Sequence, residues 1–136
     1  MGILHVYVDG ASKGNPGPSG IGVIICRGVE TIKNISCYIG ETTNNVAEYT
    51  ALIYALQECL LLKAESVIIN TDSQLIHRQI NRQYKVKNAN ILGLYNQALR
   101  LMSGFKKVLV NHIRREDNRG ADKLATKAVK EQLKKQ

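Results

Sequence analysis

The segment SVIIN, residues 66–70, is the feature that most limits how this chain can fold. It is a short apolar run without alternation, and a stretch with helical spacing lies on each side of it. Such runs are typical of strands at the centre of a sheet, where side chains are buried on both faces. The sequence therefore predicts an α/β fold in which this strand has strand neighbours and is covered by helices.

The rest of the chain supplies the other elements of such a sheet. Alternation and turn signals predict further strands at 3–9, 21–26, 31–39 and 106–113. Apolar residues at helical spacing predict helices within 42–63, 72–80, 91–102 and 121–135. A turn is expected at 27–30 and a polar loop at 114–120. The order βββαβααβα predicts one mixed five-stranded sheet with helices on its faces.

Length and composition narrow the class of protein. The 136 residues predict a single domain, 1–136, with a frayed basic tail from about residue 130. No stretch approaches the roughly 20 apolar residues of a membrane span, and the N-terminus lacks a signal-peptide pattern, so no membrane partner is expected. Three cysteines without C-x-x-C spacing indicate free thiols in a reducing compartment, the cytoplasm. We expect the chain to act as a monomer.

The net charge of +8 favours a polyanionic partner, of which nucleic acid is the most common, although charge that only provides solubility is the simpler explanation. Residues 123–136 contain five lysines and one glutamate. A solvated face of the last helix would also account for this cluster.

Four carboxylates stand at special places in the predicted fold. Asp9 ends the first strand and Asp72 follows the apolar run 66–70, while Glu48 and Asp122 lie in the first turns of two helices. Ligands of open α/β sheets gather beyond the carboxyl ends of the strands. If the first and fourth strands are neighbours, these carboxylates meet at one edge of the sheet.

Each carboxylate also has a local explanation. Glu48 lies three residues after Asn45, which fits a capping box. Asp72 could cap a helix that begins at Ser73, and Asp122 would favour a helix N-terminus through the dipole. Asp9 could form a turn with its own backbone.

The local explanations leave open why an aspartate closes two separate apolar strands. Clustered carboxylates repel one another, and a divalent cation removes this cost. Hard oxygen ligands suit Mg²⁺ or Mn²⁺. Together with the basic charge, the pattern indicates metal-assisted cleavage of a phosphodiester.

Four ordered motifs make residues 6 to about 128 similar to a known family. They are DGASKGNPGPSGIG (9–22), TTNNVAE (42–48), TDSQ (71–74) and NHIRREDNRGADKLA (111–125). Each motif carries one of the four carboxylates, and His112 stands ten residues before Asp122. In this order and at these spacings, the chain resembles ribonuclease H type 1, in a short form without the basic handle of the best-known bacterial members.

The resemblance implies a ribonuclease H-like fold with strand order 3-2-1-4-5 and helices on both faces. It implies hydrolysis of the RNA strand of an RNA/DNA hybrid, leaving 5′-phosphate and 3′-hydroxyl ends. Two Mg²⁺ ions about 4 Å apart would flank the scissile phosphate, and Mn²⁺ is the expected substitute. The four carboxylates would hold the ions, and His112 would assist proton transfer or product departure.

Other positions match family residues that contact the hybrid. Glu48 would also contact the 2′-hydroxyl beside the cut, which distinguishes RNA from DNA. The expected substrate contacts are Gly10, Asn15, Thr43, Asn44, Asn45 and Gln74. For the polar residues of this set, turn and cap chemistry is the alternative, and His112 could simply end an edge strand.

We expect this chain to bind its substrate differently from the family members that have the basic handle. The handle region shrinks to residues 81–91, and the chain contains no tryptophan. Besides the hybrid nuclease, two other functions stay open: the same chemistry on double-stranded RNA, and a hybrid-binding module with weak or lost catalysis. The presence of all four carboxylates favours the enzyme.

Overall fold

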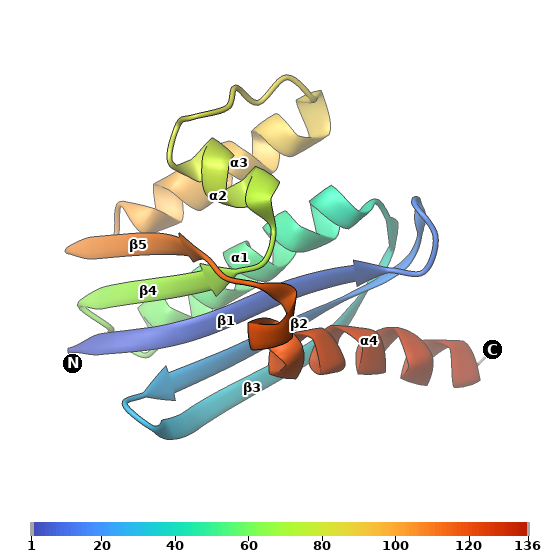
Figure 1. Cartoon of the computed structure of the whole chain (residues 1–136), viewed down its shortest axis with the longest axis horizontal. Helices are drawn as coiled ribbons and strands as arrows, with labels where there is room; N and C mark the ends of the chain where they lie inside the picture. Colours follow the sequence, from blue (N-terminus) through green and yellow to red (C-terminus); the bar gives the residue numbers. More distant parts are fainter. Residues whose placement is uncertain (1, 136) are drawn as a thin grey trace.

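The computed structural model of the chain describes residues 2–135, and its elements follow the predicted order (Figure 1). The strands are β1 (Ile3–Ser12), β2 (Gly17–Arg27), β3 (Glu30–Thr42), β4 (Ser66–Thr71) and β5 (Lys107–His112). The helices are α1 (Asn44–Leu61), α2 (Gln74–Ile80), α3 (Ala89–Met102) and α4 (Arg119–Lys134), with a short 3-10 helix η1 (Arg115–Asn118) before α4. The strands form one sheet of order β3-β2-β1-β4-β5, which confirms the predicted arrangement.

The sheet is mixed because β4 runs parallel to both of its neighbours, β1 and β5, whereas β1, β2 and β3 pair antiparallel. Val67 and Ile69 of β4 are fully buried, but Ile68, on the opposite face, is only half-buried. The prediction that β4 is buried on both faces is therefore only partly correct. The reason is that α4 packs mainly on β2 and does not extend over β4.

Helices cover the two faces of the sheet unequally. Helix α1 packs on β1 and β2 through a continuous apolar side that includes Tyr49, Leu52 and Leu56, and α3 packs on α1. Helix α4 covers β1, β2 and β3 from the other face (Figure 1). Within residues 2–135, no helix has both the length and the apolar character required to cross a bilayer.

Several element boundaries differ from the predictions. Strand β1 does not end at Asp9, because residues 10–12 continue to pair with residues 19–21 of β2. Strand β3 likewise runs on to Thr42. Residues 115–118, predicted as loop, form η1, and α4 continues to Lys134 through most of the segment that we expected to fray.

Candidate active site

Three carboxylates from three elements meet at one edge of the sheet. Asp9 lies on β1, Glu48 on α1, and Asp72 directly after β4. One oxygen of each lies within 4.8 Å of the others. Because Val8 of β1 pairs with Thr71 of β4 in parallel register, Asp9 and Asp72 both occupy the position just after this pair. The sheet register therefore places these two side chains next to each other.

Glu48 reaches Asp9 because α1 approaches β1 unusually closely at Gly10. A Cβ at Gly10 would lie 2.5 Å from Glu48 N and would overlap the backbone of Ala47. The pairing of β1 with β4 stops at Val8, so it does not extend along β1 as far as Gly10. At this point, beyond the last β1–β4 pair, the backbone N–H of Gly10 donates a short hydrogen bond to Glu48 Oε1. Gly10 thus positions a carboxylate through both its small size and its amide.

Asp122 stands in the first turn of α4 and lines the same cavity as the other three carboxylates. The cavity has a volume of about 340 Å³, and its wall also includes Asn44, Asn45 and Arg115. Helix α4 comes close to the sheet at Gly22, where a Cβ would overlap Ala121 O and lie 2.8 Å from Ala125 N. This glycine contact sets the distance of Asp122 from the sheet.

Burial and the negative charge of nearby carboxylates raise the pKa values of Asp9 and Glu48. Asp9 and Glu48 have exposed fractions of only 6% and 9%. Burial, followed by the negative charges of Glu48 and Asp72, raises the pKa of Asp9 far above its ordinary value. Burial also raises the pKa of Glu48, although the Gly10 amide opposes part of that increase. Without a cation, the folded protein therefore favours protonation of this pair.

Asn118 was not predicted as a site residue. Its side chain is buried, and its amide nitrogen donates hydrogen bonds to Val8 O at 2.9 Å and to Asp72 Oδ2 at 3.1 Å. It therefore fixes the strand before Asp9 and the carboxylate of Asp72 at once. Its Oδ1 is also buried, and no group within residues 2–135 forms a hydrogen bond with it.

Sequence reasoning missed Asn118 and Arg115 because both lie in a stretch, 114–120, whose polar composition indicated an ordinary loop. The only available signal was the place of Asn118 three residues before the helix predicted at 121–135. Arg115 lies on the cavity wall, and its positive charge slightly lowers the pKa of Glu48 against the larger effect of burial.

The local capping explanations fail for two of the carboxylates. Thr43, not Asn45, caps α1, and its Oγ1 accepts a hydrogen bond from Val46 N at 3.3 Å. Because α1 begins at Asn44, Glu48 is its fifth residue and lies beyond the first turn, in which it was predicted to lie. Ser73, not Asp72, caps α2. Asp9 pairs with Gly22 of β2 instead of forming a turn with its own backbone. Asp122 does occupy the first turn of α4, as predicted.

The expected substrate contacts fall into two groups. Gly10, Asn44 and Asn45 line the carboxylate cavity, while Asn15, Thr43 and Asn45 line a neighbouring one. Asn44 connects the β1–β2 region to α1. Its side-chain Oδ1 accepts a hydrogen bond from Ser12 N at 3.1 Å, and its backbone N–H donates one to Asn15 Oδ1 at 3.0 Å. Gln74, the first residue of α2, is exposed and lines neither cavity.

His112 ends β5 opposite Thr71, one residue before Asp72 on the neighbouring strand. Its side chain is exposed, and its ring centroid lies 5.9 Å from that of His77. Burial, followed by the charges of His112 and Arg78, lowers the pKa of His77. His112 does not line the carboxylate cavity in this conformation.

The family described as reverse transcriptase-like matches residues 7–128, which include most of this sheet and all four carboxylates. The ribonuclease H of Pseudomonas putida (strain W619) is 37% identical over an alignment of 144 positions, which covers 94% of this chain and 94% of that protein. The chain belongs to the ribonuclease H type 1 family.

Solved structures agree with this assignment. LC11-RNase H1, crystallised in complex with an RNA/DNA hybrid, is 39% identical, with a TM-score of 0.90 and coverage of 96% of this chain and 99% of that one. A bifunctional protein of Mycobacterium tuberculosis is 36% identical over 126 residues. This match covers 91% of the chain but only 35% of the mycobacterial protein, so the chain corresponds to about a third of that relative.

Proposed function

We propose that this chain is a metal-dependent endoribonuclease that hydrolyses the RNA strand of RNA/DNA hybrids and leaves 5′-phosphate and 3′-hydroxyl ends. The observation that carries the proposal is the approach of Asp9, Glu48 and Asp72, from three separate elements, to within 4.8 Å. Relatives named ribonuclease H and the hybrid complex of LC11-RNase H1 support the choice of substrate.

The donor set fits Mg²⁺, with Mn²⁺ as a substitute. All donors are carboxylate oxygens, the hard ligands that these ions prefer. Burial, followed by the negative charge of neighbouring carboxylates, raises the pKa values of Asp9 and Glu48, and a bound cation would offset both costs of ionisation. When bound, a pair of ions supplies Lewis-acid charge at the scissile phosphate and makes water a better nucleophile. Asp122, on the cavity wall, would complete the carboxylate set.

The other residues would orient the substrate and move protons. Glu48, the fifth residue of α1, lies on the cavity wall and would accept a hydrogen bond from the 2′-hydroxyl beside the cut as well as hold an ion. His112 is exposed at the end of β5, opposite the residue that precedes Asp72, and would carry a proton to the leaving 3′ oxygen or assist product departure.

The asparagines and Thr43 at the start of α1 would contact the minor groove and a phosphate of the hybrid. Asn44 and Asn45 line the carboxylate cavity, and Asn15 is tied to Asn44. Gln74, exposed on α2, would reach the groove from the other side. The free cysteines Cys26, Cys37 and Cys59 support a reducing, cytoplasmic location for a monomeric enzyme.

The proposal is tested with end-labelled RNA/DNA, RNA/RNA and DNA/DNA duplexes of one sequence, incubated with Mg²⁺, Mn²⁺ or EDTA and resolved on a denaturing gel. We expect metal-dependent cutting of the RNA strand of the hybrid alone. Cutting of the RNA/RNA duplex at a similar rate would establish the broader substrate. Binding of the hybrid without any cleavage would establish a binding module and overturn the proposal.

A further inference from the structure

A row of lysines runs along the outer side of α4, away from the sheet. Lys123, Lys127, Lys130 and Lys134 are spaced by four, three and four residues, which places them on one face of a helix, and all four are exposed. We call these four residues the lysine stripe. The opposite face of α4, with Ala121, Ala125, Ala128 and Val129, is buried on the sheet.

The lysine stripe begins at the carboxylate cavity. Asp122 lines both that cavity and a hollow along α4 whose wall includes all four lysines. A third hollow, between the β1–β2 loop and α4, is lined by Lys13 and Lys130 and shares Ser12 with the carboxylate cavity. The three hollows are therefore linked by shared residues, and lysines flank the two that lie along α4.

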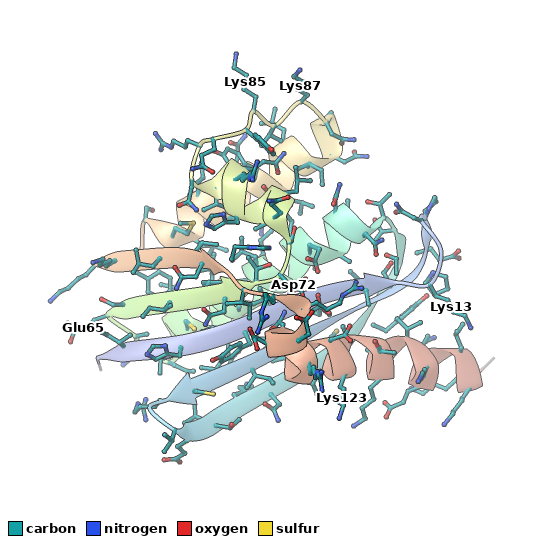
Figure 2. All side chains as sticks on the ribbon, in the orientation of Figure 1. Lys13, Glu65, Asp72, Lys85, Lys87 and Lys123 are labelled. Carbon is teal, nitrogen blue, oxygen red and sulfur yellow. The ribbon has the colours of Figure 1, made fainter. Side chains whose placement is uncertain are left out.

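Positive charge predominates along this face of α4, where four lysines stand beside Asp122 and Glu131. The single acidic residue between Lys123 and Lys134 is Glu131, which pairs with Lys127 at 3.8 Å between Nζ and Oε1. Figure 2 shows Lys13 and Lys123 on the side of the molecule where α4 runs, and Lys85 and Lys87 at the far end, with Asp72 between them. The charge that α4 presents is thus separate from that of the shortened handle region.

We infer that the lysine stripe, with Lys13, is a contact surface for the phosphate backbone of the hybrid outside the cleavage site. At about 1.5 Å per residue, the stripe is about 17 Å long. One strand of a duplex carries a charge about every 3.4 Å along the axis, so the stripe matches about five phosphates. The inference rests on the proposed function, because it assigns this surface to the same substrate.

The surface contributes affinity that does not depend on sequence. Lysine ammonium groups act as mobile point charges toward phosphate, and they release condensed counterions on binding. The stripe would hold duplex beyond the cut and so offset the missing handle and the absence of tryptophan.

The test compares two triple variants of the full chain with the same loss of charge. The stripe variant is Lys123→Gln, Lys130→Gln, Lys134→Gln, which keeps the lysine that pairs with Glu131. The control variant is Arg27→Gln, Lys106→Gln, Lys107→Gln, all exposed. Lys107 pairs with Ser66 at the start of β4, the end of the sheet away from Asp72.

Binding of a fluorescein-labelled hybrid of 18 base pairs is measured by anisotropy in EDTA, which prevents cleavage, over a series of NaCl concentrations. For the stripe variant we expect affinity at 0.15 M salt to fall about 10- to 100-fold, and the slope of log affinity against log salt to become shallower by about 2 to 3. The control variant should keep the wild-type slope and affinity within a factor of about two.

Equal effects of the two triple variants, or no effect of either, would overturn the inference and leave the stripe as a solvated face. Cleavage of the hybrid by the wild-type chain in Mg²⁺ is scored separately. If the wild-type chain cleaves the hybrid and the two triple variants bind it equally well, the role of the stripe is refuted and the proposed function stands. If only the stripe variant binds the hybrid more weakly and the wild-type chain does not cleave it, the stripe is a duplex contact and the proposed nuclease activity is refuted.

Discussion

At the scale of single residues, Asn118 joins two parts of the site with one amide group. The same nitrogen donates to Val8 O and to Asp72 Oδ2, so the backbone before Asp9 and the side chain of Asp72 share one support. Residues that orient metal ligands in this way commonly affect metal affinity or activity by about 10- to 100-fold.

Replacing Asn118 with alanine should therefore weaken Mn²⁺ binding and slow hybrid cleavage, each about 10- to 100-fold. Calorimetric titration of Mn²⁺ measures the first effect without relying on catalysis. The matched control is Asn111→Ala, an exposed asparagine on the neighbouring β5. If the two variants bind Mn²⁺ equally well, Asn118 has only a structural role.

Glu48 has a predicted role in the choice between RNA and DNA. If its carboxylate contacts the 2′-hydroxyl beside the cut, a single 2′-deoxynucleotide in the RNA strand removes that contact and misplaces the phosphate. A misplacement of about 1 Å can cost on the order of 100-fold in rate. Product mapping on a gel should show a gap on the 3′ side of the deoxy sugar, with neighbouring ribose positions still cut. Uniform cutting would leave Glu48 at most a metal ligand.

The sequence was informative about which carboxylates gather, and less about what supports them. Asp9 and Asp72 could be predicted because each follows an apolar strand, and strand ends of this kind meet at one edge. The roles of Thr43 and Ser73 as caps could not be ranked above those of Asn45 and Asp72, since all four residue types cap helices well. Asn118 depends on a hydrogen bond across 110 positions, which no local pattern reveals.

At the scale of elements, glycines set how closely the two helices that carry acidic residues approach the sheet. Gly10 admits α1, and Gly22 admits α4. The element order was predictable because periodicity differs clearly between strands and helices. The end of β1 was not, because Gly10–Ser12 have no apolar alternation and are strand only through pairing with β2.

Replacing Gly22 with alanine should push α4 outward and displace Asp122. The added methyl would overlap Ala121 O, so we expect a stability loss of about 1–3 kcal/mol and a fall in hybrid cleavage on the order of 100-fold. Urea unfolding and initial cleavage rates measure the two effects. Gly93→Ala on α3 is the control: apart from the adjoining turns of α3, no described residue has an atom within 4 Å of the added Cβ, and the variant should gain about 0.5–1 kcal/mol with unchanged cleavage. Equal cleavage by both variants would contradict the link between α4 and Asp122.

At the scale of the whole molecule, folding itself gathers the carboxylates, because they come from β1, α1 and the end of β4. In the unfolded chain they are far apart and ionise at ordinary pKa values. In the folded chain, burial and mutual repulsion raise the pKa values of Asp9 and Glu48. We therefore expect global stability to depend on pH and, if the carboxylates bind a metal as proposed, on divalent cations.

The sign of the pH effect follows from the raised pKa. The folded state binds protons at Asp9 more tightly than the unfolded chain, whose value is near 3.8. The stability associated with that proton is fully present below about pH 4 and is lost as pH rises through neutral toward the folded pKa. A cation at the carboxylates opposes this loss, because it binds the ionised folded form and not the unfolded chain.

Asp9→Asn should remove most of this linkage together with catalysis. In EDTA, we expect the variant to be more stable than the wild type by about 1–3 kcal/mol at pH 8, and by less at pH 5. In 10 mM Mg²⁺ the wild type should recover stability and the variant should not, while hybrid cleavage by the variant falls at least about 100-fold. Urea unfolding at both pH values, with and without Mg²⁺, measures the difference between the two proteins, in which other titrating groups largely cancel. A variant that is less stable than the wild type in EDTA at pH 8 would show that Asp9 is not a strained carboxylate. A variant that cuts the hybrid within tenfold of the wild-type rate would show that Asp9 is not an essential metal ligand.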